Sequence, residues 1–298
     1  MPFHLYFCKV VNHCIMKSFR LLIVFIVMSS PALSQKVHFG VFGGAAAYNG
    51  DLTSSIFPKK VTNGAIGLSI NYELTDLIML RGGITYSIVG GADRYSDKPD
   101  LVLRNLSFET RLLEFSAVGE YNLLNLYESR YTPYVFGGLA IFKFNPYVYD
   151  NGGQEHFLKP LSTEGQGING YPDRKPYSLT QFAIPFGGGF KFAINDDLRI
   201  GVEAGLRKLF TDYLDDVSTN YIDQADLLAA RGFRAVEFSY RGDEVIGGGS
   251  TYPTKGAQRG SPKSKDYYYF AGIHLTYRLG GENNNGSKGE LGCPVNVY

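Results

Sequence analysis

The most constraining feature of the sequence is an amphipathic hairpin pattern between Tyr177 and Thr219. From Leu198 to Arg207, ten consecutive residues alternate between apolar or small and mostly polar side chains. A period of two predicts a β-strand with one apolar and one polar face. The preceding residues predict a second strand with a phenylalanine-rich face, and only Asn195–Asp197 separates the two as a tight turn. The charged face points either to water, as in a soluble sandwich, or into a lumen, as in a membrane barrel.

Composition favours a single domain rich in strands. Glycine makes up 36 of 298 residues, well above the ~7% that is typical, and tyrosine and phenylalanine are abundant. After the leader, no run of eighteen apolar residues occurs, which argues against helical membrane spans. No linker-like segment divides the chain, so we expect one β-domain over residues 35–280 and a polar tail over residues 281–298.

The first 34 residues predict a secretory signal peptide. Lys17 and Arg20 precede the apolar run from Leu21 to Met28, and small residues lead to a cut before Gln35. Because Met16 begins a better signal, residues 1–15 are a candidate for a mis-assigned start. Removing the leader leaves Cys293 as the remaining cysteine, which cannot form an internal disulfide. The mature chain then has 26 cations and 28 anions, and this balance gives no sign of nucleic-acid binding.

The same alternation predicts eight strands in total. Segments with a period of two precede and follow the opening hairpin, and in one of them the apolar face changes phase at Leu112–Leu113, which predicts a β-bulge. The expected strands cover residues 36–44, 65–74, 78–88, 105–121, 131–145, 181–194, 198–207 and 267–279.

The connections between these strands alternate in length. Those at residues 75–76, 122–130 and 195–197 are short or medium, whereas those at 48–63, 90–103, 146–176 and 211–265 are long, with a possible short helix at 223–230 in the last. Outer-membrane barrels place short turns on the periplasmic side and long loops outside. We therefore predict an all-β, eight-stranded antiparallel transmembrane β-barrel in the bacterial outer membrane, with lipid around it and both termini in the periplasm.

Eight strands leave an interior that side chains just fill, so charges pointing inward must pair with one another. Both signs occur on the inward faces, which predicts a plugged lumen and argues against a general porin. The inward charges are expected to be Glu73, Arg81, Glu114, Glu120, Lys191, Arg199, Glu203, Arg207 and Arg278.

No motif indicates catalysis, a cofactor or a metal. Asp212, Asp215 and Asp216 have a superficial likeness to calcium ligands, but their spacing matches no calcium loop, and a hydrated acidic cluster is the simpler expectation. His274 and Glu203 could serve a lipid-modifying hydrolase. However, no serine stands in a nucleophile motif, so a luminal hydrogen bond is the simpler role for His274.

Several stretches, in matching order over most of the mature chain, resemble the PorG-like outer-membrane β-barrels of the type IX secretion system. The stretches are YNGDL (48–52), RNLSF (104–108), YTPYVFGGLAIFKFNP (131–146), LKPLSTEGQG (158–167), QFAIPFGGGFKFAI (181–194) and GLRKLFTDYLDDVST (205–219).

The resemblance implies a protein that is not an enzyme and that anchors the periplasmic ring of the secretion and gliding apparatus. Its partners would be a PorK-like ring lipoprotein and, through it, a PorN-like protein. A general structural or small-solute barrel and a lipid-modifying enzyme are the alternative hypotheses. On the periplasmic face, the expected contact residues are Thr75, Asp76, Tyr127, Glu128, Arg130, Asn195, Asp196, Asp197 and Cys293.

Overall fold

The computed structural model describes residues 36–53, 61–249, 251–263 and 265–279. The predicted signal peptide, the tail and Cys293 lie outside these ranges. The chain divides into the unit His38–Tyr277, which contains the barrel, and a second unit made of its two ends. In that second unit the described residues are Lys36, Val37, Arg278 and Leu279, and the Leu279 amide donates to the Val37 carbonyl at 2.7 Å.

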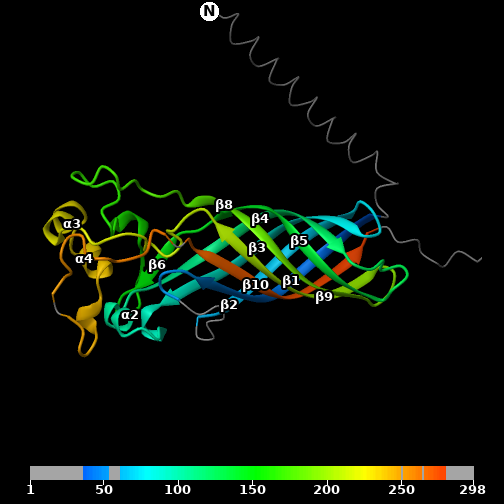
Figure 1. Ribbon diagram of the computed structural model, residues 1–298, viewed down its shortest axis with the longest axis horizontal. Coiled ribbons are helices and arrows are strands. Elements are labelled where there is room, and N and C mark those ends of the chain that lie inside the picture. The colour runs from blue at the N-terminus through cyan, green and yellow to red at the C-terminus, as the bar shows by residue number, and fades with distance from the viewer. Residues whose placement is uncertain (1–35, 54–60, 250, 264, 280–298) are drawn as a thin grey trace, which may run out of the picture. The chain divides into compact units, whose positions relative to one another are not determined.

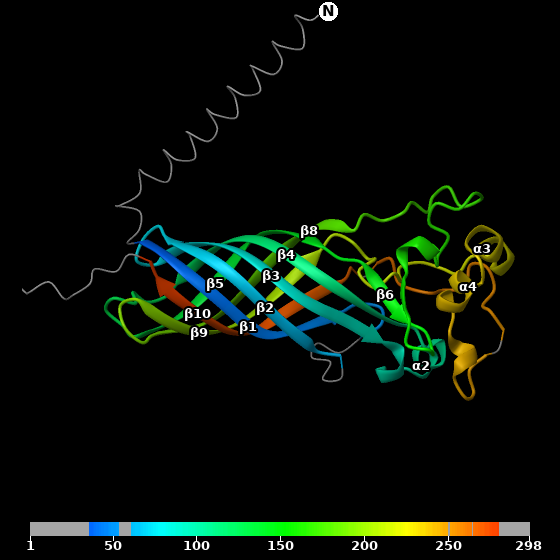
Figure 2. The same ribbon diagram turned by 180° about the vertical axis from the view of Figure 1, so that it is seen from behind.

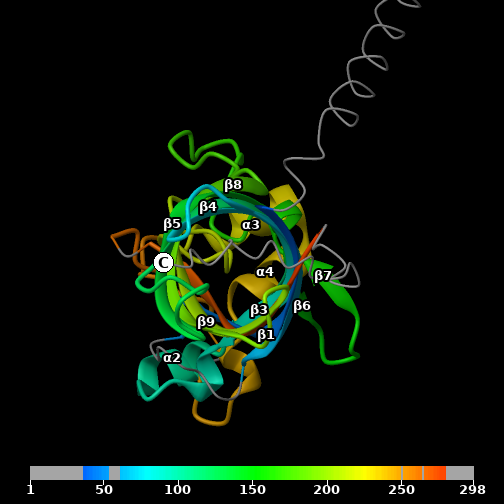
Figure 3. The same ribbon diagram turned by 90° about the vertical axis from the view of Figure 1, so that its right-hand side faces the viewer.

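Eight antiparallel strands form a closed ring, which confirms the predicted fold class (Figures 1 and 3). Each strand pairs with the next along the ring, β3 pairs with β4, and β10 closes onto β1. The ring consists of β1 (Val37–Asn49), β2 (Asn63–Glu73), β3 (Ile78–Ala92), β4 (Ser107–Asn122), β5 (Tyr131–Lys143), β8 (Thr180–Ala193), β9 (Leu198–Leu209) and β10 (Tyr267–Arg278).

Polarity across the barrel wall is inverted relative to a soluble protein. Large apolar side chains cover the outside of the strands; for example, Leu68 and Leu139 are 55% and 68% exposed. The inside of the same strands carries buried charges such as Glu120 and Arg199. Lipid on the outside and polar groups within is the arrangement of a transmembrane β-barrel, in which closure leaves no unpaired strand edge.

Three short connections lie at one end of the barrel and four long ones at the other (Figures 1 and 2). We call these the turn end and the loop end. The long connections contain further elements that sequence periodicity did not predict, apart from α3. These elements are η2 (Asp93–Tyr95), α2 (Pro99–Arg104), β6 (Pro146–Tyr149), β7 (Glu155–Phe157), η3 (Lys159–Leu161), α3 (Gln224–Arg231), α4 (Phe233–Ser239) and η4 (Gly242–Glu244).

The helix expected at residues 223–230 is α3, and the Asp223 side chain caps it by accepting from the Ala225 amide at 2.9 Å. The β6–β7 hairpin extends the sheet from β4. None of the helices in the described ranges has the length and apolarity needed to cross a membrane.

The prediction of a β-bulge at Leu112–Leu113 is wrong. β4 pairs with β3 in unbroken register, with Leu112 opposite Ser87 and Leu113 opposite Tyr86. Leu112 points inward and is fully buried. Phe108, four residues earlier, also points inward and is 2% exposed. The apolar face therefore changes sides because the interior changes character: it is charged toward the turn end and apolar toward the loop end.

At the loop end, the long connections pack against the side chains inside that end of the barrel. Their main apolar cluster joins inward residues of the strands, including Phe142 and Tyr268, with loop residues such as Leu214 and Val217. A second cluster packs Ile222 and Leu227 against residues of the 158–171 segment. We call this assembly of the four long connections the loop cap.

Candidate functional site: the charged lumen and the loop cap

The predicted inward charges meet in the lumen as a balanced network. Eight of the nine are buried, four carboxylates and four cations. Arg278 is half-buried and belongs to the terminal unit rather than to the barrel unit. The buried eight are Glu73, Glu114, Glu120, Glu203, Arg81, Lys191, Arg199 and Arg207.

Arg81 lies at the centre of this network. Its Nε is 2.9 Å from Glu120 Oε1, and its guanidinium donates to Glu203 Oε2 at 2.5 Å. Lys191 forms a close ion pair with the same Glu120, and Tyr134 donates to Glu203 at 2.7 Å. Each buried charge therefore has an opposite charge beside it, as burial in a low-dielectric interior requires.

Two further pairs lie at either side of the centre. Toward the turn end, Arg199 donates to Glu73 at 2.6 Å. Toward the loop end, Arg207 donates to Glu114 at 3.1 Å, and Tyr268 donates to the same carboxylate at 2.7 Å. Because these pairs join side chains from opposite walls, they fill the lumen rather than line it.

Glycines on β8 allow this dense packing. A Cβ on Gly187 would lie 2.3 Å from the Ala204 carbonyl oxygen, and one on Gly189 would lie 2.2 Å from that of Val202. The Gly187–Gly189 run therefore allows close approach between β8 and β9, as expected for a curved strand.

His274 takes part in the luminal network by hydrogen bonding. Its Nε2 is 3.0 Å from Ser69 Oγ and its Nδ1 is 3.3 Å from an Arg81 guanidinium nitrogen. Arginine can only donate, so Nδ1 is the acceptor and Nε2 carries the proton. A protonated Nε2 donates to Ser69 and cannot take its proton, so this pair lacks the tautomer of an activated serine nucleophile.

The predicted turn-end contact residues divide into two groups. Thr75 and Asn195 use their side-chain oxygens to close their own turns, accepting from the Ile78 amide at 3.0 Å and from the Leu198 amide at 2.7 Å. Tyr127 donates to Glu73 Oε2 at 2.7 Å, which ties it to the luminal network. Three acids and a cation are exposed to solvent: Asp76, Glu128, Asp196 and Arg130. Of these, Glu128 accepts from the Asn125 side-chain amide at 3.4 Å, while Asp197 is half-buried.

The acidic cluster Asp212, Asp215 and Asp216 is not hydrated, so that expectation was wrong. All three residues are at most 3% exposed because the loop that begins with them folds back into the barrel mouth. Burial raises the pKa of Asp212 and of Asp216 to about 6. It also raises the pKa of Asp215, which accepts a hydrogen bond from the Tyr48 hydroxyl.

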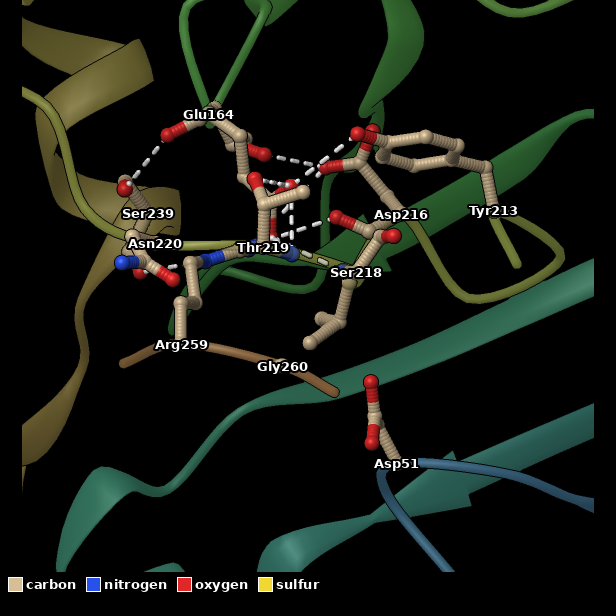
Figure 4. A network of polar contacts seen from close by, with 12 residues as sticks. Asp51, Glu164, Tyr213, Asp216, Ser218, Thr219, Asn220, Ser239, Arg259 and Gly260 are labelled. Atoms are coloured by element: carbon tan, nitrogen blue, oxygen red, sulfur yellow. Dashed lines mark hydrogen bonds and ion pairs between the residues drawn. The ribbon is translucent and has the colours of Figure 1, made fainter. Parts of the chain in front are cut away.

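Glu164 is the centre of the loop cap (Figure 4). It is fully buried and accepts from the Ser218 amide at 2.9 Å and from the Thr219 hydroxyl at 2.6 Å. Arg259 pairs with it at 3.0 Å and also donates to the Asp216 carbonyl at 2.6 Å. Three segments distant in sequence are thereby joined by one buried carboxylate.

Sequence reasoning missed Glu164 and Arg259. Glu164 contacts Ser218, which is 54 residues away, and Arg259, which is 95 residues away. Neither Glu164 nor Arg259 belongs to a periodic segment. A local signal is Gly165, which has a φ of 85° and lies within a run of tight turns. Among the residues that the structure describes, no group of three or more histidine, cysteine or acidic side chains is arranged to hold a metal ion.

The fold and the inverted polarity define the class: this is a membrane β-barrel with a packed, charge-paired interior. Within that class, residues 16–229 match the family described as "Domain of unknown function (DUF6089)", and the chain belongs to this family. No curated protein matches the sequence.

Solved structures of small outer-membrane barrels are similar to this chain. Neisserial surface protein A has 11% identity and a TM-score of 0.40, with 82% of this chain and 97% of that chain covered. Ail, the attachment invasion locus protein of Yersinia pestis, has 9% identity and a TM-score of 0.36, covering 83% and 99%. The outer membrane enzyme PagL has 12% identity and a TM-score of 0.30, covering 82% and 99%.

Proposed function

We propose that this protein is a non-conducting outer-membrane anchor rather than a pore. The observation that carries the proposal is the lumen, where Arg81 connects Glu120 and Glu203 across the interior. A solute would have to break these buried ion pairs to pass, and removing one partner of such a pair costs ~3–5 kcal/mol. The apolar outer face supplies the attachment to lipid, and the outer membrane is the location that fits an exported, closed barrel.

The finer proposal concerns what is anchored. The resemblance to PorG-like barrels supports a role in the type IX secretion apparatus, with a PorK-like ring lipoprotein and a PorN-like protein as periplasmic partners. The exposed acids Asp76, Glu128 and Asp196 at the turn end offer a surface for a basic partner. On this proposal the turn end faces the periplasm, and the loop cap faces outward.

Two measurements test the anchor proposal and the secretion proposal separately. The purified full chain in a planar bilayer should give almost no single-channel conductance, and steady ohmic steps would refute the anchor proposal. Affinity purification from solubilised membranes should recover a ring lipoprotein. The charge-reversed variant Asp76→Lys/Glu128→Lys/Asp196→Lys should lose it, whereas Asp100→Lys at the loop end should retain it. Recovery of no ring lipoprotein, together with intact secretion in a deletion strain, would refute the secretion role.

A further inference from the structure

A cavity of about 350 Å³ lies at the loop end, lined mainly by the last residues of β3, the first residues of β4, and β6 with the turn that follows it. Figure 2 shows β6 at the loop end of the barrel. The volume is within the ~300–1,000 Å³ range of small-ligand sites. The luminal network and the Glu164 centre contribute no residue to its lining, so this cavity is a separate feature of the molecule.

The cavity is lined by aromatic side chains of the β6 segment. Tyr147 is 1% exposed and donates to Glu109 Oε2 at 3.0 Å. Tyr149 packs edge-on against the Tyr147 ring at a centroid distance of 5.6 Å. Its own ring is 42% exposed, so one aromatic side chain beside the cavity remains available to a ligand.

The rim supplies polar groups that the protein does not itself use. Within the described part of the chain, the side chains of Ser107 and Asn151 make no hydrogen bond or ion pair, and Arg94 makes only a cation–π contact, 4.9 Å above the Tyr95 ring. Other polar groups are already engaged: Asp150 accepts from the Gly152 amide and lies 3.0 Å from His156 Nε2. The available set therefore combines donors and acceptors with an exposed ring.

This combination selects against three ligand classes. A hydrocarbon chain would leave the rim groups unpaired, which costs free energy. An inorganic anion would lie near the carboxylates of Glu109 and Asp150, which offset the two lining cations Arg94 and Arg241. An extended peptide has no edge of β6 to join, because β6 is already paired with β4 on one side and with β7 on the other.

We propose that this cavity is a binding site for a neutral saccharide. Sugar hydroxyls both donate and accept, which matches Arg94, Ser107, Asn151 and the free oxygen of Glu109. The C–H face of a pyranose ring would lie on Tyr149, as apolar faces do on aromatic rings. The site is at the end of the barrel that carries the long loops, so its ligand would come from the surroundings on that side of the membrane.

Saturation-transfer difference NMR on the detergent-solubilised full chain tests the proposal. The probes are maltotriose, chitotriose and mannotriose, with inorganic phosphate and trialanine as comparators. At least one trisaccharide should bind saturably, and neither comparator should compete with it. Tyr149→Ala and Arg94→Ala should each weaken binding about tenfold. Phe233→Ala removes a 69% exposed ring elsewhere on the loop cap and should leave binding unchanged.

Three results would overturn the proposal. Absence of saturation transfer to every trisaccharide, from protein that keeps its folded heat-modifiable mobility on gels, would reject a saccharide site. Unchanged binding in both Tyr149→Ala and Arg94→Ala, or an equal loss in Phe233→Ala, would reject this location. Competition by phosphate would reject a neutral ligand. Tyr149 and Arg94 are exposed, so loss of folding is not expected in their variants, and the gel shift verifies this.

Discussion

Replacement of Glu164 by glutamine should open the loop cap while leaving the barrel closed. Glutamine keeps the shape of the side chain but removes the charge opposite Arg259, whose guanidinium is 3.0 Å away and 2% exposed. It also puts an amide donor where donors from Ser218 and Thr219 now converge on carboxylate oxygens. The Glu164→Gln variant thus loses both charge pairing and acceptor capacity at one buried point.

The expected cost follows from these contacts. Removing one partner of a buried ion pair costs ~3–5 kcal/mol. Arg259 still donates to the Asp216 carbonyl and lies 4.0 Å from its carboxylate, which offsets part of the loss. We therefore expect the lower end, ~3 kcal/mol, which corresponds to a roughly hundredfold rise in the population of the opened cap.

Amide hydrogen exchange followed by mass spectrometry measures this directly, because local opening exposes the loop amides without unfolding the barrel. Peptides covering residues 211–219 should exchange about a hundredfold faster in Glu164→Gln, and peptides within β3 and β9 should not change. The control is Arg111→Gln, which breaks the pair between Arg111, whose side chain is 46% exposed, and Glu155, and should cost ~0–1 kcal/mol. Unchanged exchange at 211–219, or equal acceleration in the barrel strands, would refute the assignment of Glu164 as the centre of the cap.

Three further predictions concern the loop cap, the lipid face and the lumen. Burial raises the pKa of Asp216 to about 6, above its unfolded value near ~3.8, so the folded cap binds more protons between these values and its stability falls as pH rises. Protease cleavage of the cap should increase from pH 4 to 7, and Asp216→Asn should reduce that slope. Leu139→Arg should cost ~2–4 kcal/mol in urea unfolding from bilayers, measured against Leu139→Ala, and a cost equal to that of the alanine variant would contradict a lipid-facing position. Arg81→Met should lower the free energy of unfolding by ~3–5 kcal/mol, because Glu120 and Glu203 lose their shared cation. The unfolding temperature should fall with it, and an unchanged temperature would contradict the network.

The strands could be predicted because their outward faces keep one polarity along a period of two. Residues 198–207 show this clearly, and β9 begins at Leu198 as expected. The prediction of a β-bulge failed where the environment inside the barrel changes. Leu112 breaks the alternation of apolar and polar faces only if the whole interior is assumed to be charged. The sequence alone does not mark the height at which the lumen becomes apolar, since that depends on which loop residues fold into it.

The luminal partners were predictable as a set but not as pairs. Alternation places Arg81 and Glu203 inside, yet their contact depends on strand tilt and register across 122 residues. The loop cap was not predictable in the same way. Asp212, Asp215 and Asp216 were expected in water because isolated carboxylates prefer it, and their burial depends on partners such as Tyr48 that lie far away in the chain.

The closure of β10 onto β1 has a kinetic consequence. The first and last strands of the ring are neighbours in the sheet although residues 50–266 lie between them. Contacts of such large sequence separation form late, because the entropy of closing the loop is lost before the contacts are gained. The ring therefore remains open until its last strand has arrived, and until then β1 and β10 expose unpaired backbone groups that lipid cannot satisfy. Assembly in the membrane is thus expected to end with a single closing step, and any machinery that assists it must hold these two edges apart from other strands.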